Sequence, residues 1–121
     1  MWDDLQAFKA DFFKALAHPL RIRILELLAE GHKSVNEIQT ILNSEGSTVS
    51  QQLSVLRNKN IVTGTKHGKQ VVYSLRDPLI MKLLDVAKEI FNNHLVSTIS
   101  ILEELDTSNE NTNDKEVKRN S

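Results

Sequence analysis

The stretch SVNEIQTILNSEGSTVSQQLSVLRNK, residues 34–59, decides the fold because it contains the signals for two short helices joined by a tight turn. It begins with Ser34 and Glu37 in the S-x-x-E pattern of a capping box, whose side chains bond the free N–H groups at a helix start. The turn-forming residues NSEG follow at 43–46. Ser44 is expected to cap the second helix.

The second helix of this pair has one apolar side and one side of small polar groups. Val49, Leu53 and Leu56 recur at i, i+4 and i+7, the apolar stripe of an amphipathic helix. The opposite side carries Ser47, Thr48, Ser50, Gln51, Ser54 and Asn58. A face that meets only water usually carries Glu and Lys, whereas short donors and acceptors suit close approach to a polar surface. The pattern is typical of the recognition helix of a helix-turn-helix, which we expect at residues 47–58.

Length and composition predict a single globular domain. The chain has 121 residues, 40% of them hydrophobic, and no run approaches the roughly 18 apolar residues that a membrane span needs. It has no cysteine, and therefore neither disulfides nor a thiolate metal site. We expect no cofactor, no membrane association and, since the acidic start lacks a signal-peptide pattern, a cytoplasmic location.

The net charge of −1 hides a separation of charge along the chain. Residues 18–76 carry eight Lys or Arg against four Asp or Glu, while residues 77–105 carry two against five. The basic excess surrounds the helix-turn-helix, as a nucleic-acid footprint requires. An ordinary solvated surface would explain an excess of this size equally well.

After residue 59 the periodicity changes from helical to alternating. Residues 62–66 and 70–75 predict the two strands of a β-hairpin, and Gly68 supplies the positive φ that its tight turn demands. The tip gathers Lys66, His67 and Lys69. Because a hairpin tip needs no such cluster for stability, we interpret residues 66–70 as a wing that follows the DNA backbone.

Two helices are expected before this central unit and one after it. The first runs from about Asp3 to Ala17, and a second follows the break at His18-Pro19 and stops at Gly31. The last, about Pro78 to Leu105, has an apolar stripe that a core of this size does not cover. This surplus, with the aromatic first helix, predicts a subunit interface made by Leu5, Phe8, Phe12, Phe91, Leu95, Ile99 and Leu102. The alternative is a last helix packed wholly on its own protomer.

The C-terminal stretch DTSNENTNDKEVKRNS, residues 106–121, is polar with a single apolar residue, Val117. Such a segment buries too little surface to offset the entropy of ordering. We therefore expect one domain over residues 1–105 and a disordered polar tail after it.

Three segments together resemble the ArsR/SmtB family of bacterial winged-helix repressors: FKALAHPLRIRILELL at 13–28, STVSQQLSVLRNKNIV at 47–62 and GKQVVYSL at 68–75. The resemblance implies a mainly α fold with a small β-hairpin, a dimeric winged helix-turn-helix in the order α-α-α-α-β-β-α, paired through its first and last helices. It further implies binding to a palindromic operator in double-stranded DNA, and repression that an effector relieves.

Site residues follow by position from the same resemblance. Ser47, Thr48, Ser50 and Gln51 match the groove-facing residues of the recognition helix, and Gln52 stands where the family most often has His. Lys66, His67 and Lys69 match the wing.

The chain departs from the family pattern where many members bind metals. The positions of a family Cys-x-Cys motif hold Ser34 and Asn36, which are not soft ligands. On the last helix, a family Asp-x-His motif is reduced to Asp85-Val86-Ala87, and His94 is the only His. We therefore expect a repressor without a recognised metal or thiol sensor and with an unidentified effector. A metal-responsive repressor, with His94 and Glu103 or Glu104 as ligands across a dimer, stays open as the alternative.

Other function classes have less support. A winged helix used only for protein interaction would not need the polar helix face and the basic hairpin tip. Enzymatic activity is not expected, because the sequence has neither a Gly-rich phosphate loop nor a nucleophile paired with a base.

Overall fold

The computed structural model describes the backbone of residues 3–120 and the side chains of residues 3–108. Its elements are α1 (Asp4–Leu16), α2 (Pro19–Glu30), β1 (Lys33–Ser34), α3 (Val35–Leu42), α4 (Gly46–Asn58), β2 (Val62–His67), β3 (Gln70–Leu75) and α5 (Leu79–Asn120). The chain divides into two units, Met1–Leu84 and Asp85–Ser121. The predicted mainly helical winged fold is confirmed. The structure adds the two-residue strand β1.

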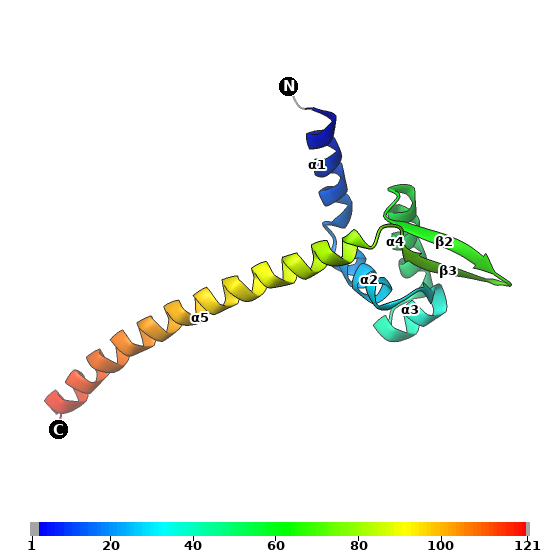
Figure 1. Ribbon diagram of the computed structural model, residues 1–121. Coiled ribbons are helices and arrows are strands. Elements are labelled where there is room, and N and C mark those ends of the chain that lie inside the picture. The colour runs from blue at the N-terminus through cyan, green and yellow to red at the C-terminus, as the bar shows by residue number, and fades with distance from the viewer. Residues whose placement is uncertain (1–2, 121) are drawn as a thin grey trace. The chain divides into compact units, whose positions relative to one another are not determined.

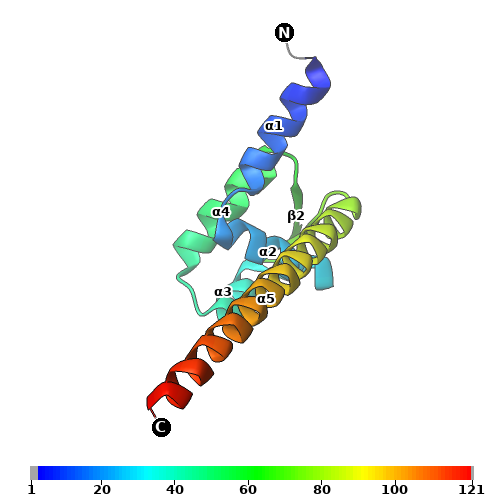
Figure 2. The same ribbon diagram turned by 90° about the vertical axis from the view of Figure 1, so that its left-hand side faces the viewer.

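The core of the first unit lies where α2, α3, α4 and β2 meet. Its fully buried side chains are Ile24, Leu25, Ile38, Val49, Leu53, Leu56, Ile61 and Val62. The apolar stripe predicted for the second helix of the pair is thus the part of α4 that enters the core. Figure 1 shows α2, α3 and α4 grouped at the base of the hairpin, and Figure 2 shows α2 beside α4.

Local signals in the sequence place the ends of α2 and α3. The His18 Nδ1 accepts a hydrogen bond from the Leu20 N–H at 3.1 Å, and Pro19 follows as the first helical residue. Ser34 and Glu37 form the predicted capping box: the Ser34 Oγ accepts from the Glu37 N–H and the Glu37 Oε1 accepts from the Ser34 N–H.

The turn between α3 and α4 differs from the prediction in one respect. Asn43 ends α3 in the left-handed region with φ 49°, as Asn tolerates. Glu45, and not Ser44, is the N-cap of α4, and its side chain makes no capping bond. At Gly46, the first residue of α4, the side-chain amide of Gln39 occupies the space that a Cβ would take.

The three strands form an antiparallel sheet in the order β1-β3-β2. Ser34 of β1 pairs with Val72, and Gly64 of β2 lies opposite Tyr73. Gly68 has φ 64° and Lys69 a negative φ, as in a two-residue type II′ turn. The hairpin of β2 and β3 projects away from the helices of its unit (Figure 1).

Helix α5 is longer than the sequence predicts. It runs from Leu79 to Asn120 and so includes backbone of the polar stretch 106–120, for which composition predicts disorder. The reason lies in what the stretch lacks: no Gly or Pro interrupts residues 79–120, so nothing stops a helix that has already begun. Within the described residues, no helix combines the length and apolar character needed to cross a bilayer.

Candidate nucleic-acid interface

One side of α4 is exposed and polar along its whole length. Its exposed residues are Ser47, Ser50, Gln51, Ser54, Arg57 and Asn58, which recur at spacings of three and four and so form one row. The opposite side is anchored by Val49, Leu53 and Leu56, each with no exposed surface. This burial fixes the rotation of the helix about its axis, and therefore fixes which residues the row presents.

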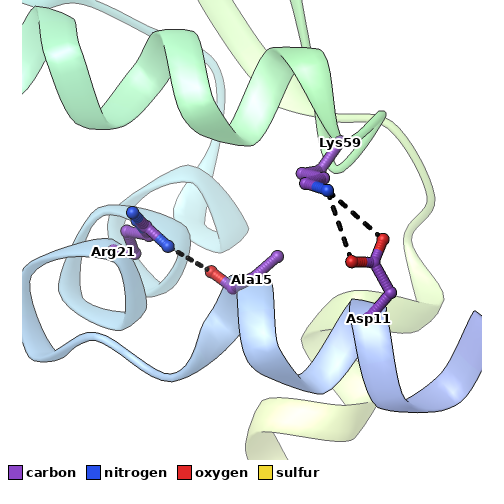
Figure 3. Close-up of polar contacts among 4 residues, drawn as sticks. All are labelled: Asp11, Ala15, Arg21 and Lys59. Carbon is purple, nitrogen blue, oxygen red and sulfur yellow. Dashed lines mark hydrogen bonds and ion pairs between the residues drawn. The ribbon is translucent and has the colours of Figure 1, made fainter.

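Two residues predicted to contact DNA, Thr48 and Gln52, do not belong to that exposed row. Thr48 is only partly exposed. Gln52 is also half-buried and turns toward α2, where its Oε1 accepts a hydrogen bond from the Arg21 Nε at 2.8 Å. Arg21 in turn donates from a guanidinium nitrogen to the Ala15 carbonyl oxygen at 3.2 Å (Figure 3). Gln52 therefore lies in a polar connection from α4 through α2 to the end of α1.

The C-terminal end of α4 is also connected to α1. The Lys59 Nζ lies 3.3 Å from the Asp11 Oδ1 and 3.4 Å from its Oδ2 (Figure 3). Both side chains are largely exposed, so the pair contributes about 1 kcal/mol or less to stability. Its main effect is geometric, because it ties the first helix to the end of the recognition helix.

The wing presents the cationic residues that the sequence predicts there. Lys66, His67 and Lys69 are all exposed around the turn at Gly68. Below them, the Thr63 and Ser74 hydroxyls are 3.1 Å apart and link the two strands. The cationic tip is therefore carried by a paired hairpin rather than by a loose loop.

A polar hollow of about 300 Å³ joins the wing to the helix pair. Its lining combines Ser34 and Asn36 at the start of α3, Ser50 of α4, and Lys69 and Gln70 of the hairpin. The recognition helix and the wing thus border one continuous surface. Sequence reasoning missed Asn36, and it included Gln70 only as part of the wing at 66–70, without a place beside α3. Their shared place at the hollow could have been found only from the pairing of β1 with β3, which brings the start of α3 against the wing.

Hydrogen bonds at the start of α3 favour the charged form of Glu37. Hydrogen bonding to Ser34, first from its backbone N–H and then from its side chain, lowers the pKa of the Glu37 carboxyl below its ordinary value. The Glu37 carboxylate is therefore ionised under neutral conditions and holds the cap of the first helix of the pair.

The predicted interface residues are mostly apolar and exposed. Phe8 is 65% exposed and stacks on Phe12, with ring centroids 5.9 Å apart. Phe12 itself is partly buried against the core. Leu5, Phe91, Leu95, Ile99 and Leu102 are exposed by between 44% and 59%. Exposure of so many large apolar side chains on two helices is unusual for a monomer.

The described part of the chain contains no group of three or more His, Asp or Glu side chains placed to hold a metal ion. Ser34, at one family metal position, is buried and occupied in the capping box. His94 is exposed on α5, where its carbonyl oxygen accepts from the Thr98 hydroxyl.

Comparisons with known proteins agree with this geometry. The family described as "Bacterial regulatory protein, arsR family" matches residues 18–63. The uncharacterized HTH-type transcriptional regulator Rv0081 of Mycobacterium tuberculosis is 43% identical over 104 residues, covering 85% of this chain and 91% of that protein. Its crystal structure superposes with a TM-score of 0.73 at 42% identity, over 81% of this chain and 99% of that one.

Two further relatives describe activity and assembly. A biofilm growth-associated repressor of Agrobacterium fabrum is 38% identical over 82 residues, 68% of this chain and 70% of that protein. The solution structure of the homodimeric winged helix-turn-helix DNA-binding domain of Mb0332 from Mycobacterium bovis has a TM-score of 0.69 at 27% identity. That match covers 78% of this chain and 92% of the other.

Proposed function

The chain belongs to the arsR family of bacterial regulatory proteins and is a helix-turn-helix transcriptional regulator, and from this premise we propose that it is a homodimeric repressor of a palindromic operator. Each protomer inserts α4 into a major groove and lays its wing on the flanking backbone. The observation that carries this proposal is the polar hollow, which makes Ser50 of α4 and Lys69 of the wing parts of one surface.

The two parts of that surface have different tasks. Ser47 and Gln51 lie in the N-terminal half of α4, the part that contacts base edges in helix-turn-helix proteins. A glutamine amide pairs in bidentate fashion with adenine, and a serine hydroxyl adapts to several bases. Lys66 and Lys69 carry point charges on flexible stems at the wing, which suits phosphate oxygens rather than base edges.

Gln52 has a supporting task in this proposal. Its carbonyl oxygen is occupied by the Arg21 Nε, so its side chain is held against α2. Holding that side chain keeps α4 from rotating, and the rotation of α4 decides whether Gln51 faces the groove. Gln52 therefore positions the residues that read the bases.

Dimerisation follows from the exposed apolar surface of α1 and α5. An isologous pair presents two identical recognition helices related by a two-fold axis, and a palindrome repeats the same half-site with that symmetry. The homodimeric winged helix-turn-helix domain of Mb0332 supports this arrangement by analogy. The proposal leaves the identity of the effector open.

Selection of bound duplexes from random-sequence DNA tests the proposal. We expect enrichment of an inverted repeat with half-sites about one helical turn apart, bound by two protomers per duplex and weakened steeply by salt. Enrichment of a single unrepeated site bound by one protomer would contradict the dimer. Binding without sequence preference would contradict the proposal that the chain represses a specific operator.

A further inference from the structure

The polar hollow between the helix pair and the wing is lined by side chains that can donate hydrogen bonds. Asn36 offers an amide from α3, Ser50 a hydroxyl from α4, and Lys69 and Gln70 an ammonium and an amide from the hairpin. Within residues 3–108, none of these four side chains has a hydrogen bond or an ion pair. Three separate segments of the chain therefore bring unoccupied donors to one space.

Tyr73 of β3 adds a hydroxyl that the fold leaves without a partner. The residue is 8% exposed and lines the hollow, yet its hydroxyl forms no hydrogen bond with any of residues 3–108. No polar side-chain atom of the described residues is both buried and unpartnered. The Tyr73 hydroxyl therefore reaches open space, and the hollow is the opening that Tyr73 lines. A donor held free on a buried side chain is matched to a group that enters from outside.

The position of the Tyr73 ring is fixed by a glycine on the neighbouring strand. Gly64 of β2 lies opposite Tyr73 in the sheet, and a Cβ added there would lie 3.0 Å from an atom of the ring. The missing side chain lets the ring pack closely across the hairpin. The Tyr73 hydroxyl is therefore held in one place before any ligand arrives.

The lining of the hollow carries a positive charge and no carboxylate. Of the residues that line it, only Lys69 is charged. Glu37, which follows Asn36 in the chain, is not among them, and its Oε1 accepts from the Ser34 N–H. Ser34 does line the hollow, and its hydroxyl accepts from the Glu37 N–H and keeps its own O–H free to donate. Neutral donors around one cation suit an oxyanion with several acceptor oxygens, such as a phosphate group.

We propose that the polar hollow is the seat of one phosphodiester group of the operator in each half-site, bound by Lys69, Ser50 and Tyr73. This phosphate seat rests on the proposed function and deepens it, because it assigns one backbone group to one place on the protein. DNA is the source of the phosphate because Ser50 belongs to the exposed row of α4 and Lys69 to the wing, so a duplex that contacts both passes over the hollow. A phosphate fixed there sets the register of α4 in the groove.

Neutralising the operator phosphates one at a time tests the phosphate seat. A methylphosphonate replaces one charged backbone oxygen by a methyl group, and the selected operator is scanned with it position by position. We expect one position in each half-site to weaken binding of the natural chain roughly tenfold, since a hydrogen bond to a charged group is lost. In Tyr73→Phe the same methylphosphonate should cost much less, because the bond that it disrupts is already absent.

Tyr73→Phe also tests the seat without any change in the DNA. It removes only an unpaired hydroxyl, so thermal stability should stay unchanged while affinity falls roughly tenfold per half-site. Cognate and random duplexes should weaken alike, because a phosphate carries no sequence. The salt slope should stay constant, since no charge is removed, whereas Lys69→Ala should reduce it by about one unit.

Lys66→Ala is the matched control for coupling to the seat. Lys66 is exposed at the same hairpin tip as Lys69 but does not line the hollow. Its loss should therefore add independently to the loss caused by the methylphosphonate at the seat. Coupling to Tyr73→Phe at one position per half-site, without coupling to Lys66→Ala, supports the proposal.

The outcomes separate the phosphate seat from the proposed function. If the operator binds but no backbone position couples to Tyr73→Phe, or if Lys66→Ala couples as strongly, the seat is overturned and the regulator stands. If, in addition, inorganic phosphate shifts the amide resonances of Asn36 and Lys69 in the free protein, the occupant is a free phosphate rather than the DNA backbone. A protein that binds no duplex selectively overturns the proposed function and the seat together.

Discussion

Helices α4 and α5 are both amphipathic, yet they expose opposite sides. In α4 the apolar side is fully buried in the core, and the exposed row is serine, glutamine, asparagine and arginine. In the second unit, the part of α5 from Asp85 onward exposes Phe91, Leu95 and Ile99. Contact with water alone explains neither surface, since the row on α4 consists mostly of small uncharged polar side chains and the stripe on α5 is apolar.

The difference indicates two different partners. A small polar row suits a surface of donors and acceptors such as a DNA groove. A long apolar stripe suits another apolar stripe, because covering it removes hydrocarbon from water at roughly 25 cal/mol per Å². The first helix belongs to both surfaces, since Phe8 is exposed and Asp11 contacts the end of α4.

Removing the apolar surface should have the largest effect. The double variant Phe91→Glu, Leu95→Glu places charges where the second copy packs, so we expect monomers by analytical ultracentrifugation. Operator affinity should fall by a factor on the order of 100 or more, because two linked half-site contacts become one. Val86→Glu, at an exposed apolar position away from the stripe, is the matched control. Unchanged dimerisation of the double variant would refute the role of this surface.

Removing single side chains from the polar surface should have the next largest effect on operator affinity. Gln51→Ala is expected to cost roughly 1–3 kcal/mol on the cognate operator and little on random DNA, since it removes a base contact. Lys69→Ala should weaken both alike and reduce the salt slope by about one unit, since it removes a phosphate contact. Fluorescence anisotropy on both duplexes at two salt concentrations measures this. Equal loss for Gln51→Ala on both would assign base reading to another residue of the row.

Several features of the fold were predictable because their signals are local. The capping box at Ser34 and Glu37, the glycine at 68 and the stripe through Leu53 each lie within a few residues, and the structure has them as predicted. What the sequence did not provide is contact between distant segments. Strand β1 is two residues long, and only its pairing with β3 defines it.

The same limit explains the differences at the candidate site. Gln52 was predicted as a DNA contact from its position in the family pattern, but its Oε1 accepts a hydrogen bond from the Nε of Arg21, 31 positions earlier. Asn36 and Gln70 border the hollow only because the sheet brings α3 to the wing. The length of α5 escaped prediction for another reason. Composition measures whether a segment can bury surface, whereas a helix already begun continues until a residue stops it.

Removing the helix cap at Ser34, which supports the polar surface, should have a smaller effect, and this effect is on stability. Ser34→Ala should lower stability by about 1 kcal/mol, because it leaves the Glu37 N–H without its partner. The pKa of Glu37 is lowered in the folded chain, so its contribution is present above the ordinary carboxyl pKa and is lost as pH falls through the folded value. Urea unfolding from about pH 7 to pH 3 should show this loss in the natural chain and not in Glu37→Gln.

The smallest effect is expected from metal ions. Zinc, nickel or cobalt at stoichiometric concentration should change operator affinity by less than about tenfold, which is 1.4 kcal/mol of coupling. The reason is that the chain has no cysteine and the described residues no convergent ligand group. A larger change that His94→Ala abolishes would mean that the apolar surface of α5 also carries a sensor.

Ser34 belongs to two elements at once: it is the last residue of β1, paired with Val72, and the N-cap of α3. The wing and the helix pair are therefore joined through one buried residue rather than by a free linker. The proposed contact surface therefore has no hinge between the wing and the helix pair. It loses less conformational entropy on binding than a hinged wing would. Loosening this joint should therefore slow operator capture, even where every contact residue is unchanged.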